Sequence, residues 1–364
     1  MTENQYIPDT VSPPGETLAE LLEERGISQV QLSKQLGLHR KTINEILQGK
    51  SVLTSDTALQ LEHVLHVPAE FWVRREADYR AHLARKRETA ELKTQAVHTL
   101  KGIPYRAMQR AGWIDATPDR VQILRELLRF FRVGTLQQLT PESLLAGAAF
   151  RRPMKLESDP LALAAWLRRG EVLAERAETP TYDRVAFEHA LERVRAFTVH
   201  ETAVALQEAK VECAQAGVLL LIVPGLKGAC VSGAARWVLG RPVIQLSLRH
   251  RSDDDVWFTF FHEAGHILMH GEGAQFLDED RGAPTNSKDL EADRFAADHL
   301  VSSQAWSSFV NAGPFSEAAV VRFAGHVGIA PAIVVGRLQH EKRLRHTQLN
   351  HLKGMVQPGE CLDA

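Results

Sequence analysis

The sequence predicts a mainly α-helical protein with one small β-sheet, an α+β fold. Three observations lead to this prediction: short, capped helical segments fill residues 16–79, helical periodicity dominates residues 96–205, and strand-like runs gather between residues 218 and 248. A chain of 364 residues is long enough for two or three domains. We therefore expect an all-helical N-terminal domain over residues 1–95, a central helical region over 96–205 and a C-terminal domain with the sheet over 206–364.

Composition narrows the class of protein. Hydrophobic residues make up 44% of the chain and charged residues 24%, which is typical of a soluble globular protein. The formal net charge of −2 gives no overall basic field, so any nucleic-acid binding must come from a local patch.

The three cysteines form no CxxC pair, which favours a reducing compartment. No secretory signal is visible, and the longest apolar run, Val218–Val223, is far shorter than the ~20 residues of a membrane span. We expect a cytoplasmic protein without a membrane partner.

Two short helices are predicted near the N-terminus. Ser28 to Gln31 has the S-x-x-Q pattern of a capping box, so a helix should run from Gln29 to Leu36 and end at Gly37. A second helix, Arg40–Leu47, carries apolar residues at positions 43, 46 and 47, and Gly49 closes it. Two short helices across a tight turn form the arrangement in which the second helix enters the major groove of DNA.

Charge in this region has the sign that DNA binding requires. Residues 28–51 carry four basic side chains and one acidic side chain, whereas residues 1–90 as a whole carry 11 basic and 13 acidic. A basic cluster can also be a solvated helix face, so charge alone leaves both interpretations open. The side chains predicted to contact bases or phosphates are Gln29, Arg40, Lys41, Thr42, Asn44, Gln48 and Lys50.

Residues Ser12 to Arg80 resemble the Cro/repressor-type helix-turn-helix of HigA-like antitoxins. The segments PGETLAELLEERGISQVQLSKQLGLHRKTINEILQGK and TALQLEHVLHVPAEFW carry the resemblance. His39 departs from it, because the family more often has a small capping residue there. The resemblance implies a homodimer that binds double-stranded operator DNA, in particular its own promoter. The sequence identifies no toxin partner.

The middle and C-terminal parts differ in periodicity. Residues 96–205 contain helical stripes but no chemical motif, so we interpret them as a helical spacer. Strand-like runs follow as VLLLIV, ACVSGAARWVL and PVIQLSL; in the last, Ile244, Leu246 and Leu248 alternate with other residues as in a half-buried strand. We expect a small mixed or antiparallel sheet, then a helix from about Asp254, helices again over 315–345, and a loose end after Asn350.

The predicted helix WFTFFHEAGHILMH contains His262, Glu263 and His266 in the pattern HExxH. Residues i and i+4 share one helix face, so both imidazoles can bind one ion while Glu263 lies beside its open position. The alternative is that both histidines are ordinary core or surface residues. A third ligand must come from elsewhere, and the segment DLEADRFAADHLVS offers four candidates that spacing does not separate: Glu291, Asp293, Asp298 and His299.

From about Val218 to Leu338 the chain resembles the ImmA/IrrE metallopeptidases, whose hallmarks are FTxxHExGHxxxH and a Glu-Ala-Asn/Asp-x-Phe-Ala-Ala helix. These stand here as FTFFHEAGHILMH at 258–270 and EADRFAA at 291–297. The resemblance implies a zincin-like fold with Zn²⁺ bound by His262, His266 and Glu291. It also implies that Glu263 is the general base, that Asp293 supports the ligands, and that His270 does not bind metal.

Together these features predict a DNA-binding transcription regulator that is also a zinc-dependent endopeptidase. Glu263 would activate a zinc-bound water to cleave a specific regulatory protein, such as a repressor or an antitoxin. The strand Val243–Leu248 is our candidate for holding an extended substrate, and Arg249, His250 and Arg251 are candidate oxyanion donors. One alternative is a regulator whose zincin domain is a non-catalytic sensor or partner-binding module. Another is a peptidase whose helix-turn-helix binds protein rather than DNA.

Overall fold

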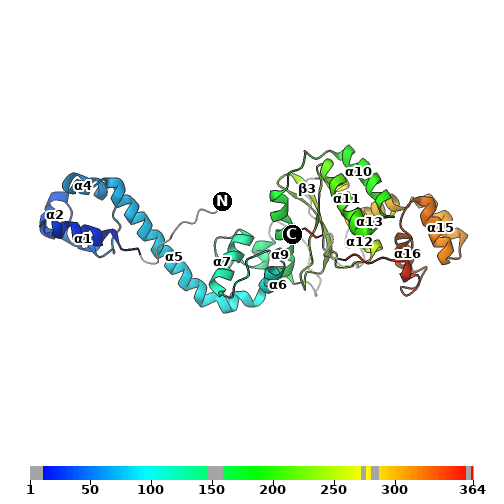
Figure 1. Cartoon of the computed structure of the whole chain (residues 1–364), viewed down its shortest axis with the longest axis horizontal. Helices are drawn as coiled ribbons and strands as arrows, with labels where there is room; N and C mark the ends of the chain where they lie inside the picture. Colours follow the sequence, from blue (N-terminus) through cyan, green and yellow to red (C-terminus); the bar gives the residue numbers. More distant parts are fainter. Residues whose placement is uncertain (1–10, 146–158, 272–275, 280–286, 358–361, 364) are drawn as a thin grey trace. The chain divides into compact units, whose positions relative to one another are not determined.

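The computed structural model describes residues 11–145, 159–271, 276–279, 287–357 and 362–363, and the chain forms two compact units, residues 1–96 and 97–364 (Figure 1). The predicted α+β class is confirmed, because the described residues are mainly helical and carry one mixed sheet. No single described helix is long and apolar enough to cross a membrane. The pair Glu317–Val327 and Pro331–His340 meets that test only together and is bent by 115°.

The first unit is all-helical. Its elements are α1 (Pro14–Glu24), α2 (Gln29–Leu36), α3 (Arg40–Leu47), α4 (Ser55–Leu65) and the first part of α5 (Ala69–Gly102). One side chain in three or four along each helix is buried, as the 3.6-residue period requires. The resulting core is made of Leu18, Leu22, Leu32, Leu36, Ile43, Ile46, Leu53, Ala58, Leu61, Leu65, Ala69 and Trp72.

The second unit begins within α5 and contains all of the sheet. Its helices before the sheet are α6 (Tyr105–Arg110), α7 (Arg120–Phe131), η1 (Leu136–Gln138), α8 (Pro141–Leu144), α9 (Pro160–Arg176), α10 (Arg184–Phe197) and α11 (Thr202–Gln215). Those after its third strand are α12 (Asp253–His270), α13 (Ser287–Leu300), α14 (Ser303–Ala312), α15 (Glu317–Val327), α16 (Pro331–His340) and η2 (Asn350–Leu352). Pro153, which interrupts the helical periodicity of residues 96–205 in the sequence, lies outside the described residues.

The sheet is mixed and has the strand order β1-β3-β2-β4. Its strands are β1 (Leu219–Ile222), β2 (Val231–Val238), β3 (Arg241–Leu246) and β4 (Phe276–Glu279). β1 runs parallel to β3, whereas β2 is antiparallel to both β3 and β4. The prediction of a small mixed or antiparallel sheet ahead of a helix near Asp254 is confirmed for β1, β2 and β3, whereas β4 follows that helix and was not predicted.

Helices cover both faces of this sheet. On one face Ala235, Ile244 and Leu246 pack with the aromatic side chains of α12 in one apolar core. On the other face lies α9: Nε1 of Trp166 donates to the carbonyl of Val223 at 3.0 Å, and Nε2 of Gln245 donates to the carbonyl of Trp166 at 2.8 Å. The prediction that the β3 segment is half-buried was therefore wrong, because Gln245 is fully buried under α9.

The C-terminal segment is not the loose end that its composition suggested. Met355 bridges to Ser252 just before α12, and Val356 is 3% exposed. Nζ of Lys353 lies 2.7 Å from Oδ2 of the buried Asp254, in the first turn of α12. The amide of Ile222 donates to Asp363 at 2.6 Å, so the tail also contacts β1. These contacts fix the start of the helix that carries the HExxH motif.

We expect Lys353→Ala to lower the free energy of unfolding by about 3 kcal/mol, because it leaves the buried Asp254 carboxylate without its cation. Chemical denaturation measures the loss. The matched control is Arg343→Ala, whose ion pair with Glu341 is 44% exposed on the arginine side and should contribute under about 1 kcal/mol. Equal effects of the two variants would show that the buried pair does not anchor the tail.

Candidate metal centre and recognition helix

The two histidines of the HExxH motif face one point. His262 and His266 lie one turn apart on α12, and their Nε2 atoms are 3.1 Å apart. Both side chains are buried, as are the aromatic residues that hold the helix in the core. Two nitrogen ligands of one tetrahedral zinc ion lie about 3.3 Å from each other. The spacing of this pair therefore fits zinc.

Helix α13 supplies two carboxylates to the same place. Oδ1 of Asp293 lies 2.9 Å from Nδ1 of His262, and Oδ1 of Asp289 lies 3.8 Å from Nε2 of His266. A carboxylate on the second nitrogen of a ligand histidine fixes the orientation and tautomer of the ring. Asp293 thus has the supporting position that the resemblance implied.

Gly265 allows α13 to come this close. A Cβ atom at Gly265 would lie 2.9 Å from Cδ1 of Phe295 and 3.4 Å from Cα of Ala292. A side chain at this position would therefore have to displace the Phe295 ring that packs between the two helices.

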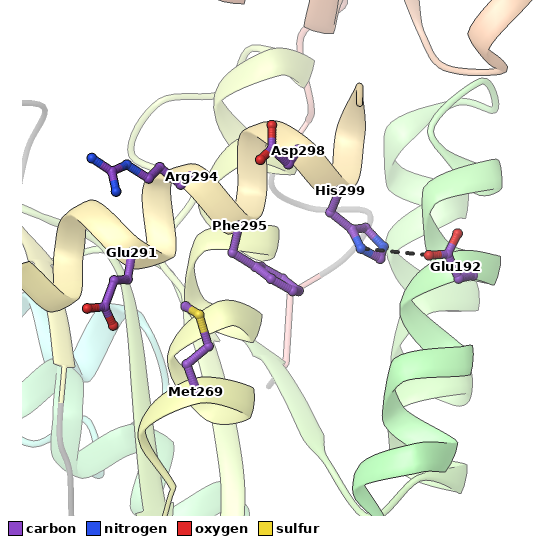
Figure 2. Close-up of a pocket in the computed structure, with 7 residues that line it drawn as sticks. All are labelled: Glu192, Met269, Glu291, Arg294, Phe295, Asp298 and His299. Carbon is purple, nitrogen blue, oxygen red and sulfur yellow. Dashed lines mark ion pairs between the residues drawn. The ribbon is translucent and has the colours of Figure 1, made fainter. Parts of the chain in front are cut away.

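Glu291 is placed differently from the other predicted ligands. Its Oε2 atom lies 3.9 Å from Nε2 of His270, and its side chain is 53% exposed. It lines an open depression of about 520 Å³ between α13, the end of α12 and α10, shown in Figure 2, together with Glu192, Met269, Arg294, Phe295, Asp298 and His299. Among the described residues, no group of three potential ligands is placed so as to hold a metal ion.

Sequence reasoning overlooked Asp289. Its signal was the helical period, because Asp289 and Asp293 are four residues apart on α13, just as His262 and His266 are on α12. Side chains four apart share a face, so the helix that turns Asp293 toward the histidines also turns Asp289 toward them. Glu291 lies two residues from Asp289 and two from Asp293, so its side chain points to the opposite side of α13 from theirs.

The environment keeps His266 neutral. Burial, followed by the neighbouring His262, His270 and Lys288, lowers the pKa of His266 to about 2. Phe276 of β4 stacks on this imidazole, with 3.8 Å between ring centroids and 7° between planes. Metal binding requires a neutral imidazole, so burial beneath Phe276 favours the form of His266 that can act as a ligand.

Two further expectations concerned substrate contacts. The prediction that the strand Val243–Leu248 holds an extended substrate was wrong. β3 is paired with β1 on one side and with β2 on the other, so it has no free edge for a peptide. Arg249, His250 and Arg251 lie in the connection from β3 to α12, where the carbonyl of Arg251 accepts a hydrogen bond from the amide of Val356 at 2.8 Å.

In the first unit, the predicted helix pair is confirmed. Oγ of Ser28 accepts from the amide of Gln31 at 3.2 Å, and Gly37 ends α2 with φ 66°, a conformation that suits glycine. α3 begins after His39, whose Nδ1 accepts from the amide of Lys41 at 3.2 Å and replaces the usual small capping side chain.

The predicted DNA contacts lie on one exposed stretch of the first unit. Thr42 is half-buried, and the other six are exposed: Gln29, Arg40, Lys41, Asn44, Gln48 and Lys50. Behind them, Ile43 and Ile46 fix α3 in the core. Nη2 of Arg80 donates to the carbonyl of Ser51 at 3.0 Å, so α5 is tied to the segment that follows α3. Arg40, Lys41 and Asn44 of the exposed set thus lie on α3, whereas Gln29 begins α2, and Gln48 and Lys50 follow α3.

Comparison with known proteins defines the class. Residues 18–72 match the helix-turn-helix family model, and residues 224–324 match that of the IrrE N-terminal-like domain of the M78 peptidases. The chain therefore contains a helix-turn-helix domain followed by a metallopeptidase-like domain of the M78 type. More particularly, it joins a HigA-like helix-turn-helix at the N-terminus to an ImmA/IrrE-type domain at the C-terminus.

The N-terminal part of the chain is similar to known proteins. The chain is 38% identical over 60 residues to antitoxin HigA-1 of Vibrio cholerae serotype O1, a match that covers 16% of this chain and 56% of that relative. The chain thus spans about half the length of this curated relative. A solved structure of an addiction module antidote protein of a HigA family from Coxiella burnetii is 30% identical, with 23% of this chain and 94% of that chain covered and a TM-score of 0.21.

Proposed function

We propose that this regulator is also a zinc-dependent endopeptidase that cleaves a specific regulatory protein, such as a repressor or an antitoxin. The observation that carries the proposal is the pair of buried imidazoles whose Nε2 atoms lie 3.1 Å apart, next to Glu263 on the same helix. A histidine pair needed only for packing would not require a carboxylate on the outer nitrogen of His262.

His262 and His266 would hold the zinc ion, and α13 would supply the third ligand. The contacts favour Asp289, which faces His266, whereas the family resemblance gives Glu291. A zinc ion bound there would lower the pKa of a water molecule and polarise a peptide carbonyl.

Glu263 is the general base of the proposed reaction. It is fully buried, one turn before His266, with its carboxylate against β2 at Gly233. In this position a carboxylate oxygen takes up a proton from water and returns it to the leaving amine. Burial keeps solvent from competing for that proton.

β4 offers a place for an extended substrate. It lies at the end of the sheet and pairs with β2, and its Phe276 stacks on His266. A peptide that adds to an edge strand is held by backbone hydrogen bonds, with specificity from alternate side chains. In our proposal the substrate therefore aligns with β4.

The helix-turn-helix would bind the regulator to a specific DNA site. We propose that a homodimer places two copies of α3 in successive major grooves of an operator, in particular in its own promoter. The exposed basic side chains of Arg40, Lys41 and Lys50 contact phosphates, and Asn44 and Gln48 read base edges.

Zinc content tests the metal centre. Protein purified without added metal should contain about one zinc per chain, lost in His262→Ala and in Asp289→Ala but kept in Glu291→Ala. Elemental analysis by mass spectrometry measures it. Loss in Glu291→Ala with retention in Asp289→Ala would establish Glu291 as the ligand. No zinc in the wild type, even after its addition, would leave the domain as a non-catalytic sensor or partner-binding module.

Asp293 should control zinc affinity without being a ligand. We expect Asp293→Ala to weaken zinc binding about 10- to 100-fold, because Nδ1 of His262 loses its partner, and Asp293→Asn to weaken it less, because an amide oxygen still accepts. Competition with a chromophoric chelator gives both affinities. Unchanged affinity in Asp293→Ala would contradict the role of this contact.

DNA binding should depend on α3. We expect Arg40→Ala/Lys41→Ala to bind the DNA upstream of its own gene at least about tenfold more weakly than wild type, with the salt dependence reduced by about two phosphate contacts. Fluorescence anisotropy over a range of salt concentrations measures both. The matched control is Arg85→Ala/Lys86→Ala, which removes the same charge from exposed positions of α5. Equal losses in the two pairs would indicate a general charge effect rather than groove contacts.

A further inference from the structure

On the face of β2 that meets α12, the side chains are very small. Gly233 and Ala235 lie on this face. The side chain of Arg236 lies on the opposite face, where its Nη2 donates to the carbonyl of Leu167 in α9 at 2.8 Å. Small residues on a strand let a helix backbone approach it closely. At Gly233 the space left by the missing side chain is filled by Glu263.

A Cβ atom at Gly233 would overlap the general base. It would lie 2.6 Å from Oε1 of Glu263, 2.9 Å from its Cγ, and 2.8 Å from Cγ2 of Thr259. Real Cβ atoms do not approach other atoms this closely. The φ of Gly233 is not in the left-handed region, so the backbone itself would accept alanine. The requirement for glycine comes from the contact with Glu263 and Thr259.

Neither partner can move away easily. Gly233 pairs with Leu246 of β3 on one side and with Asp278 of β4 on the other, and the register between β2 and β4 shifts between Val231 and Gly233. Beside that shift, Oγ of Ser247 donates to the carbonyl of Val231 at 2.6 Å. Glu263 is fully buried, so its side chain could shift only by displacing neighbours in a close-packed interior.

We propose that Gly233 is a positioning residue. Because it has no side chain, the Glu263 carboxylate can occupy the space next to β2 and so lie beside the histidine pair. The proposal deepens the proposed peptidase function and rests on it for its catalytic meaning. A side chain at position 233 displaces the Glu263 carboxylate, while His262 and His266, held from α13, keep their places.

A double-mutant cycle tests the steric part without any substrate. Gly233→Ala is introduced into the wild type and into Glu263→Ala, and thermal unfolding is measured with chelator present so that metal binding does not contribute. We expect Gly233→Ala to lower the Tm by about 3–10 °C in the wild type and by less than half as much in the Glu263→Ala background. The remaining loss there reflects Thr259.

Gly170 provides the matched control, on the other face of the sheet. A Cβ atom at Gly170 would overlap Oε1 of Gln245, so Gly170→Ala should also be destabilising, and by the same amount in both backgrounds. Gly225→Ala, whose Cβ would meet Cβ of Ser247 at an ordinary 3.5 Å, should be neutral in both. These controls separate a specific overlap with Glu263 from a general intolerance of the sheet.

Equal Tm losses for Gly233→Ala in the two backgrounds would overturn the proposal. If Gly233→Ala does not fold in the wild type, recovery of folded protein by Glu263→Ala supports the proposal and its absence overturns it. Zinc content supplies the second readout: Gly233→Ala should keep the zinc of the wild type, and loss of zinc would contradict a role confined to Glu263. If the wild type neither binds zinc nor cleaves a partner, the proposed peptidase function is wrong. The double-mutant cycle still shows whether Gly233 leaves the space that the Glu263 side chain occupies.

Discussion

The candidate metal centre depends on how closely α12 approaches its two neighbours. On one side α12 lies against β2, where Gly233 leaves room for Glu263; on the other it lies against α13, where Gly265 leaves room for Phe295. Because protein interiors are close-packed, a single added methyl group would have to be accommodated by moving Glu263 and Thr259 on the first side or Phe295 on the second. The two glycines thus bring Glu263, Asp289 and Asp293 to the histidine pair.

Local sequence signals predicted the local structure well. The capping box at Ser28, the stop at Gly37 and the apolar spacing of Ile43 and Ile46 gave α2 and α3 with their ends, because caps and periodicity act within a few residues. The HExxH spacing likewise placed both imidazoles on one face of α12, since that geometry belongs to the helix itself.

What the sequence could not supply were relations between distant segments. The alternation in PVIQLSL indicated a half-buried strand, but α9, some 80 residues earlier by sequence, covers the polar side and satisfies Gln245. The composition after Asn350 indicated a loose end, yet Lys353 finds a buried carboxylate on α12. In both cases the deciding partner is far along the chain, and periodicity carries no information about it.

The choice of third ligand shows the same limit at the site itself. The family motif draws attention to Glu291, but which face of α13 meets α12 is set by Phe295 against Gly265, together with Ala292 and Ala296 in the core. Once that face is fixed, residues 289 and 293 point to the histidines, and residue 291 lines the depression between α13, the end of α12 and α10. In the proposed metal centre, the carboxylates available to the histidine pair are therefore set by the packing of apolar residues between the two helices. A substitution at Ala292 or Phe295 that rotated α13 would change which carboxylates face His262 and His266.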